Sequence, residues 1–256
     1  MIKLYIKKIK NHLLNLNYYL FVVPKGNKPI ENYVFVTGSD SSHFKSAVNC
    51  IKSIKSNSNP SVIIFWDLGC SKEEILGIKS LGVTLKTFPY KDYPSFYNIK
   101  VDAGKYAWKS AIIKKTISEY KLPTIWFEAG NILKNPFKIL TTLEVLGFYS
   151  PYSNGKVKEW TFPSVLNRFS YINNIAELRN LNGACICFNP SNNIAMELLE
   201  NWEYLSTDIN FIAPIGSSRL NHRQDQSLLT LLAHKYNLAK NMPHGYLDFS
   251  IHNDID

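Results

Sequence analysis

Short apolar runs that alternate with segments of helical periodicity constrain the fold of this 256-residue chain more than any other feature. Four runs have the β-branched and aromatic composition of strands, over residues 33–37, 62–66, 81–88 and 124–127. The segment after the first run has apolar residues at helical spacing, namely Phe44, Val48, Ile51 and Ile54. This order predicts an α/β fold, with a mostly parallel sheet, right-handed crossovers and flanking helices.

The second half of the chain is less regular but continues the pattern. We expect helices over residues 105–120, 191–206 and 223–236, strands over 146–149 and 182–188, and a polar loop over 150–158. Ser71 and Glu74 have the spacing of a capping box, and Ser41 or Ser42 is expected to cap the helix after the first strand. There is no internal repeat and no second core behind a linker, so a single domain is predicted.

The excess positive charge lies at the N-terminus. The chain has 29 Lys and Arg against 20 Asp and Glu, and residues 1–30 hold six lysines and no acid, so the remainder has 23 basic and 20 acidic side chains. A nucleic-acid-binding domain usually spreads basic residues over one folded face, so we expect no nucleic-acid partner. A basic arm suits an anionic lipid surface, at about 1 kcal/mol per cation near the membrane.

Two structures stay open for this arm. Apolar residues recur near helical spacing with lysines between them, as in an amphipathic helix that lies on a membrane: Ile2, Ile6, Ile9, Leu13 and Leu16. The same stripe also suits a helix packed on the domain. The apolar stretch 18–23 is too short to span a bilayer, no cleavage site of a secretory signal follows it, and residues 24–29 have the composition of a linker.

The four cysteines indicate reduced thiols. Their spacings are not those of a zinc ribbon or a CxxC redox motif, and Cys185 and Cys187 alternate within an apolar run, on one face of a predicted strand. We therefore expect buried, reduced cysteines in a cytoplasmic protein.

The motifs of several large enzyme classes are absent from the sequence. It contains no GxGxxG, no GxxxxGK[ST], no HExxH and no GxSxG. A Rossmann dinucleotide site, a P-loop NTPase, an HExxH metalloprotease and an α/β-hydrolase are therefore not indicated.

Polar residues follow three predicted strands at the edge where open parallel sheets bind ligands. The first strand ends at Thr37-Gly38-Ser39-Asp40, the second at Asp67 and the fourth at Glu128-Ala129-Gly130-Asn131. At any one position the alternative is a turn former or helix cap. Three acidic side chains at one edge favour a nucleotide or metal site.

Four motifs occur in order within residues 33–236. They read Trp66-Asp67-Leu68-Gly69, Tyr106-Ala107-Trp108-Lys109, Trp126-Phe127-Glu128-Ala129-Gly130 and His222-Arg223-Gln224-Asp225-Gln226-Ser227. Together they resemble a largely uncharacterised group of GT-A-type nucleotide-sugar glycosyltransferases. One position departs from that group, because Glu128 stands where the group has Asp.

The resemblance implies a GT-A-like domain over residues 31–240, between the arm (1–30) and a C-terminal tail (241–256). It implies transfer of a sugar from a nucleotide-diphosphate donor, with UDP expected, to a glycan or lipid-linked acceptor in polysaccharide synthesis. The alternative, which Glu128 keeps open, is a related carbohydrate- or nucleotide-binding protein without turnover. We expect a cytoplasmic protein, peripheral on the inner membrane face through residues 1–28.

GT-A enzymes commonly hold a divalent cation, Mn²⁺ or Mg²⁺, with an Asp-x-Asp motif. The matching stretch here offers the carboxylate of Glu128 and the amide of Asn131. Two arrangements stay open. Glu128 binds the cation with other ligands, of which His244 is the candidate, or the cationic Lys109 and Arg223 replace the metal.

The resemblance also implies roles for individual side chains. Asp225 is the candidate general base for the acceptor hydroxyl; it could also bind the acceptor without taking its proton, or be an ordinary acid at a helix N-terminus. The donor-binding candidates are Thr37, Gly38, Asp40, Asp67, Lys109, Glu128 and Arg223. The acceptor-binding candidates are Trp160, Thr161, His222 and Gln226.

Overall fold

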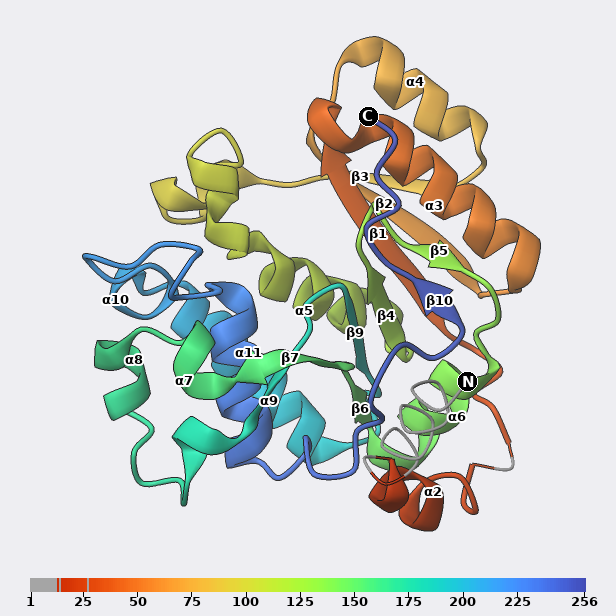
Figure 1. Cartoon of the computed structure of the whole chain (residues 1–256). Coiled ribbons are helices and arrows are strands. Elements are labelled where there is room, and N and C mark those ends of the chain that lie inside the picture. Colours follow the sequence, from red (N-terminus) through yellow and green to blue (C-terminus); the bar gives the residue numbers. More distant parts are fainter. Residues whose placement is uncertain (1–12, 14, 27) are drawn as a thin grey trace, which may run out of the picture.

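The computed structural model in Figure 1 describes residues 13, 15–26 and 28–256. Its centre is a six-stranded sheet with the order β3-β2-β1-β4-β9-β6. The parallel strands are β1 (Val34–Asp40), β2 (Val62–Gly69), β3 (Thr84–Thr87) and β4 (Thr124–Phe127). The strand β9 (Cys185–Phe188) is antiparallel to both β4 and β6 (Phe148–Tyr149). The predicted α/β class with a mostly parallel sheet is confirmed.

Helices cover both faces of this sheet (Figure 1). On one face, Phe65 of β2 packs with α3 (Phe44–Asn57) and α4 (Lys72–Ser80). Because side chains alternate along a strand, Trp66 enters the larger core on the opposite face. That core includes α5 (Trp108–Tyr120), α9 (Asn193–Ser206) and α11 (Asp225–Lys235). The sheet is therefore the middle of three layers, which explains its continuous apolar runs.

Shorter elements surround the layers. The remaining helices are α2 (Leu16–Phe21), α6 (Phe137–Leu146), α7 (Val157–Trp160), α8 (Pro163–Asn167) and α10 (Ile209–Ile212). Two small antiparallel pairs join β5 (Ile132–Leu133) to β10 (Phe249–Ser250), and β7 (Tyr152–Lys156) to β8 (Arg179–Leu181). The 3-10 turns are η1 (Ser41–His43), η2 (Tyr90–Asp92), η3 (Ser95–Tyr97), η4 (Asp102–Tyr106) and η5 (Ile175–Glu177).

Of the two helix caps predicted from the sequence, the structure has one. The capping box of Ser71 and Glu74 is present at the start of α4 and is confirmed. The expected cap at Ser41 or Ser42 is wrong, because the Asp40 carboxylate accepts a hydrogen bond from the Ser42 amide at 3.1 Å and caps η1 instead. The helix α3 follows only at Phe44.

The long helix predicted from Lys105 begins later, at Trp108. Residues 102–106 form η4, and each has a φ between +48° and +62°. Right-handed helix cannot pass through such a run, which costs about 1–2 kcal/mol for each residue with a Cβ. This left-handed turn precedes α5 and sets where Tyr106 and Lys109 lie.

Two predicted segments differ in detail. The expected polar loop at 150–158 contains β7, which pairs with β8, and the strand expected over 182–188 begins at Cys185. The tail is anchored at its end, since the Asp256 carboxylate accepts hydrogen bonds from the amides of Lys45 and Ser46 and from the Ser46 hydroxyl. The C-terminus therefore lies at the first turn of α3 (Figure 1).

Most of the predicted N-terminal helix, residues 1–12 and 14, lies outside the described residues. In the described part, Tyr18 and Val22 are buried, and the Tyr18 hydroxyl shares a hydrogen bond with that of Thr142 at 2.9 Å. Asn15 accepts a hydrogen bond from the amide of His244 at 2.6 Å. This segment is thus packed on the domain through Asn15, Tyr18 and Val22. None of the helices in the described residues is long and apolar enough to cross a bilayer.

All four cysteines are free, and three of them, Cys50, Cys185 and Cys187, are buried. Burial raises the pKa of the Cys50 thiol to about 12. The expectation of reduced, mostly buried thiols is consistent with this structure.

Candidate functional site

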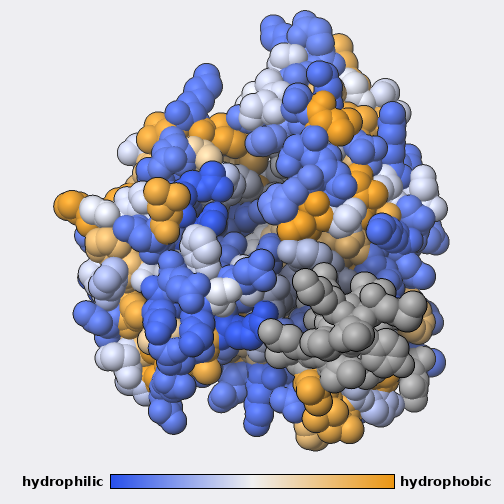
Figure 2. Space-filling model, in the orientation of Figure 1, coloured by the Kyte–Doolittle hydropathy of each residue, from blue (hydrophilic) through white to orange (hydrophobic). Residues whose placement is uncertain are grey.

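A cavity of about 900 Å³ opens at the carboxyl ends of β1 and β4. Open α/β sheets bind ligands where the strand order reverses, and the order β3-β2-β1-β4 places that point between β1 and β4. The cavity is lined by the end of β1, the loop after β4, the first turns of α5 and α11, and the tail. Figure 2 shows the hollow on this face with largely hydrophilic surface around it.

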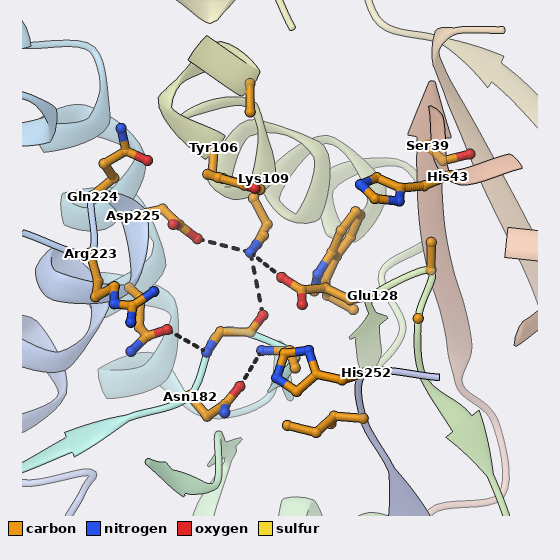
Figure 3. Close-up of a pocket in the computed structure, with 18 of the residues that line it drawn as sticks. Ser39, His43, Tyr106, Lys109, Glu128, Asn182, Arg223, Gln224, Asp225 and His252 are labelled. Atoms are coloured by element: carbon orange, nitrogen blue, oxygen red, sulfur yellow. Dashed lines mark hydrogen bonds and ion pairs between the residues drawn. The ribbon is translucent and has the colours of Figure 1, made fainter. Parts of the chain in front are cut away.

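A buried ion cluster forms the floor of the cavity (Figure 3). The Lys109 ammonium lies 2.8 Å from Oε1 of Glu128 and 3.0 Å from Oδ2 of Asp225. It also donates to the Gly183 carbonyl at 3.4 Å. The ammonium thus lies against three protein oxygens: it is hydrogen-bonded to Glu128 and Gly183 and ion-paired with Asp225. The Lys109 side chain is only 2% exposed. It links the motif at the start of α5 to the motif after β4, through Glu128, and to the motif at the start of α11, through Asp225.

The charges in this cluster stabilise one another. Burial acts to lower the pKa of Lys109, but the carboxylates of Asp225 and Glu128 outweigh it and raise that pKa above its ordinary value. Burial raises the pKa of Asp225, and the charge of Lys109 opposes this rise without cancelling it. The ammonium therefore stays charged, while Asp225 holds its proton to a higher pH than an ordinary aspartate.

The backbone around Asp225 is held in a strained position. Gln224 precedes α11 with φ +48° and ψ −118°, a conformation that residues with a Cβ rarely adopt. Neighbouring contacts enforce it: the Arg223 amide donates to the Trp160 carbonyl at 3.0 Å, and the Trp202 indole donates to the Asp225 carbonyl at 3.0 Å. Such strain persists where surrounding structure imposes it, and it is common at functional sites.

Most of the predicted site residues do meet in this cavity. Its lining includes eight of them, from five separate stretches of the chain: Gly38, Asp40, Lys109, Glu128, Trp160, Arg223, Asp225 and Gln226. Asp40 and Glu128, the acids that follow β1 and β4, thus share one cavity. The roles assigned to these residues stay predictions.

Two other predicted donor residues are not among those that line the cavity. The Asp67 carboxylate accepts hydrogen bonds from the amides of Gly69 and Cys70, both at 2.8 Å, so it forms the turn after β2. Thr37 is fully buried within β1. The turn-forming alternative therefore describes Asp67 better than a nucleotide contact.

Three further predicted residues also lie away from the cavity lining. Thr161 is buried, and the His222 ring bridges the Phe162 amide and the Phe211 carbonyl. His244 contacts Arg179 and Tyr152 instead of Glu128, and burial, with the charge of Arg179, lowers its pKa to about 4. These contacts are structural, and the fold does not bring His244 and Glu128 together.

Sequence reasoning missed several residues of the lining: His43, Tyr106, Arg219, His252 and Asp254. His43 follows the first strand and Tyr106 stands in a quoted motif, so both were within reach. His252 and Asp254 could not be placed, because long-range contacts bring the tail to the cavity, among them the β10–β5 pairing and the bond from the Asn253 amide to the Gly130 carbonyl.

The divalent cation that the GT-A fold implies does not fit these residues as arranged. In the part of the chain that the structure describes, no three His, Cys, Asp or Glu side chains converge to hold a metal ion. The Glu128 carboxylate is engaged by Lys109, and the buried Asn131 amide donates to the Ala184 carbonyl at 2.7 Å. A cation here would have to displace the ammonium from Glu128.

Comparisons with known proteins identify the fold. A family model described as a protein of unknown function, DUF1647, matches residues 5–114. No curated protein matches the sequence. The apo structure of the bifunctional glycosyltransferase WbbM is similar, with a TM-score of 0.52 and 14% identity, over 86% of this chain and 40% of that one. Mouse xyloside xylosyltransferase 1, in its apo form, gives a TM-score of 0.50 and 11% identity, over 81% of this chain and 83% of that one.

These similarities establish a GT-A-like fold for this chain. The chain spans 40% of the length of WbbM. At 11–14% identity the similarity shows the fold alone.

Proposed function

We propose that this protein is a glycosyltransferase that moves a sugar from a nucleotide-diphosphate donor to a glycan or lipid-linked acceptor. The observation that carries the proposal is the Glu128–Lys109–Asp225 cluster, built from three distant motifs at the point where the strand order reverses. The cavity of about 900 Å³ is large enough for a nucleotide and two sugars. Both similar structures above are glycosyltransferases by name.

The donor would bind in the crevice between β1 and β4. Gly38 lines this crevice, and a Cβ there would meet the Trp66 carbonyl at 2.7 Å, so the glycine is needed for close packing of the strands. Beyond it, Asp40 and Glu128 can accept hydrogen bonds from ribose or sugar hydroxyls. His43 and His252 face the same space and can donate N–H groups to the diphosphate (Figure 3).

Asp225 would take the proton of the acceptor hydroxyl as its oxygen attacks the sugar carbon. A base works best when its pKa approaches the working pH, and burial moves the pKa of Asp225 in that direction. Lys109 would act as a positioning residue, because its ammonium is held by Glu128, Asp225 and the Gly183 carbonyl, and its charge opposes the rise in the pKa of Asp225.

A thermal-shift panel of nucleoside diphosphates and nucleotide sugars tests this function. We expect at least one nucleoside diphosphate, UDP first, to raise the melting temperature by the same amount in EDTA and in manganese. Dependence on manganese would show that a metal displaces Lys109. Absence of any shift would favour a carbohydrate-binding protein without turnover, for which Glu128 in place of Asp is the supporting feature.

Binding and turnover are separated by one substitution. Asp225→Asn keeps the shape of the side chain and removes its basicity, so the nucleotide shift should remain while transfer is lost. The matched control is Asp67→Asn, at the carboxylate that forms the turn after β2. Full transfer by Asp225→Asn would remove Asp225 from the role of base.

We also propose that the N-terminal arm binds an anionic membrane surface. On α2 the packed side is Tyr18, while Leu16, Leu20 and Phe21 are each at least 50% exposed. Figure 2 shows this hydrophobic cluster at the lower edge of the molecule. The surrounding sequence carries six lysines and no acid over residues 1–30, as suits anionic lipid headgroups. The acceptor would then be presented at that surface.

A further inference from the structure

Two arginines face the cavity without a partner for their charge. Arg219 and Arg223 both line it, and neither guanidinium forms an ion pair or a hydrogen bond with any residue in the described ranges. They are close enough for their charges to act on each other: burial first, and then the charge of Arg219, lowers the pKa of Arg223. Like charges are seldom left together unless an anion is to join them.

Each guanidinium lies over an aromatic ring. The Arg223 carbon Cζ is 4.2 Å from the centre of the Trp160 ring, and that of Arg219 is 5.1 Å from the centre of the Tyr106 ring. The cation–π contact holds each guanidinium in place, and its N–H donors have no partner among the described residues. The two rings belong to different elements, α7 and η4, so the site is assembled by the fold.

The use of arginine here is itself informative. The chain has 25 lysines and only four arginines, and two of those four line this one cavity. Where a plain positive charge suffices, this sequence has lysine. Arginine differs in presenting a rigid fork of donors that matches the paired oxygens of phosphate and carboxylate.

Arg223 lies beyond Asp225 when viewed from the donor crevice, and Arg219 lies over Tyr106 of the same cavity. Figure 3 shows Ser39 and His43 on the β1 side, Arg223 on the α11 side, and Lys109, Glu128 and Asp225 between them. If the donor occupies the β1–β4 crevice and Asp225 takes the acceptor proton, the side of Arg223 is where the acceptor enters. Asn154 and Gln226 line the same side and offer neutral hydrogen-bonding groups for sugar hydroxyls.

We propose that Arg219 and Arg223 bind an anionic group, a phosphate or a carboxylate, on the acceptor sugar. This inference rests on the proposed glycosyltransferase function, and it reassigns Arg223 from the donor diphosphate to the acceptor. The site selects acceptors by charge: a neutral sugar leaves two guanidiniums unpaired, whereas an anionic one pairs with both.

Calorimetric titration at the cavity tests the assignment, with the donor crevice filled by saturating UDP. The probes are glucose 6-phosphate for the phosphate source, glucuronate for the carboxylate source and methyl glucoside as the neutral sugar. We expect at least one anionic sugar to bind tenfold or more tighter than methyl glucoside. Whichever of glucose 6-phosphate and glucuronate binds more tightly shows whether the site takes a phosphate or a carboxylate. Equal affinity for all three would overturn the proposal.

Variants separate this site from the donor site. Arg223→Met and Arg219→Met should each weaken binding of the anionic sugar tenfold or more and change the affinity for UDP less than threefold. Arg223→Lys keeps the charge but lacks the forked guanidinium, so it should recover only part of the lost affinity. The matched control is Arg168→Met, since Arg168 stacks on Phe211 at 4.3 Å but does not line the cavity. A tenfold loss of UDP affinity in the cavity variants would assign the arginines to the donor diphosphate and overturn the inference.

The failure of the proposed function would look different. Titrations repeated without nucleotide still report whether the anionic sugars depend on Arg219 and Arg223. A protein that binds no nucleoside diphosphate but binds anionic sugars through these arginines would refute glycosyl transfer and retain the anion site. Binding that is unchanged by all the arginine variants would refute the site itself.

Discussion

Lys109 is the residue on which the candidate site depends. It is 2% exposed, and its ammonium lies within 3.0 Å of carboxylates from two other motifs. Paired in this way, the three charges tolerate burial, whereas a single carboxylate left unpaired in the interior is costly. The functional cluster and part of the stability of the fold thus rest on the same side chain.

Lys109→Met should destabilise the protein by about 3 kcal/mol, because it leaves buried Asp225 and half-buried Glu128 without their counter-ion. Urea unfolding measures the change. Lys114→Met is the control on the same helix, since Lys114 is 38% exposed and pairs with Glu203 at 3.3 Å, and it should cost less than about 1 kcal/mol. Equal losses in the two variants would show that the cluster contributes no more than a surface ion pair.

The pH dependence of transfer should report Asp225. The base must be ionised, and its pKa is raised above the usual value of about 3.9, so the rate should fall at a higher pH than an ordinary aspartate would give. The charge of Glu128 contributes to the rise, so Glu128→Gln should move the acidic limb of kcat/KM to lower pH. If the acidic limb stays in place or moves to higher pH in Glu128→Gln, the limb does not report the ionisation of Asp225.

Among the elements, the left-handed turn η4 is the part of this site that the sequence pattern did not predict. The sequence predicts the start of a helix near residue 105, because the spacing of apolar residues carries no information about the sign of φ. In the structure, residues 102–106 have positive φ. In the structure these residues form a turn. The turn places the Tyr106 ring beneath Arg219 and the Lys109 ammonium in the floor of the cavity. Gly104 makes this turn possible, since a Cβ there would meet the Tyr97 carbonyl at 2.2 Å and the Trp108 ring at 2.8 Å.

Gly104→Ala should therefore destabilise the protein by about 2 kcal/mol or more, through the clash and the positive φ of +62°. Thermal unfolding, read by tryptophan fluorescence, measures it. Gly77→Ala in α4 is the control: its Cβ would have a nearest contact of 3.4 Å with Phe44, and the change should stabilise the helix by about 0.5–1 kcal/mol. Unchanged stability in Gly104→Ala would mean that η4 is not formed as described.

The sequence predicted the elements that local rules determine. Apolar runs located β1, β2 and β4, and the strand-end rule brought Asp40 and Glu128 to one cavity. It did not distinguish Asp67, because a carboxylate that closes a turn has the same sequence signature as one that binds a ligand. His252 and Arg219 reach the site through long-range packing of the tail and the segment before α11, for which the sequence has no periodic signal.

Over the whole molecule, the exposed apolar side chains of α2 lie outside the lining of the cavity. The sequence of the arm holds six of the 29 basic residues, and α2 within the arm has exposed apolar side chains. The cavity, by contrast, combines carboxylates, Lys109 and two arginines. This separation suits an enzyme that binds a lipid surface with one part and nucleotide and sugar with another.

Replacing Leu16 and Leu20 by Ser should reduce binding to phosphatidylserine vesicles at least tenfold and change the melting temperature little, because both side chains are exposed. Vesicle sedimentation measures the binding. Ile215→Ser, at a 97% exposed position outside the arm, is the control and should bind as the original protein does. A double variant that sediments normally would remove α2 from the membrane surface.

The most direct test of the account is release of nucleoside diphosphate from a panel of nucleotide sugars, with the original protein and with Asp225→Asn. We expect the original protein to consume at least one donor in the presence of EDTA, faster with an anionic acceptor sugar than with a neutral one. We expect Asp225→Asn to bind the same donor and not to turn it over. Consumption of no donor by the original protein, or equal rates in the two proteins, would contradict the account.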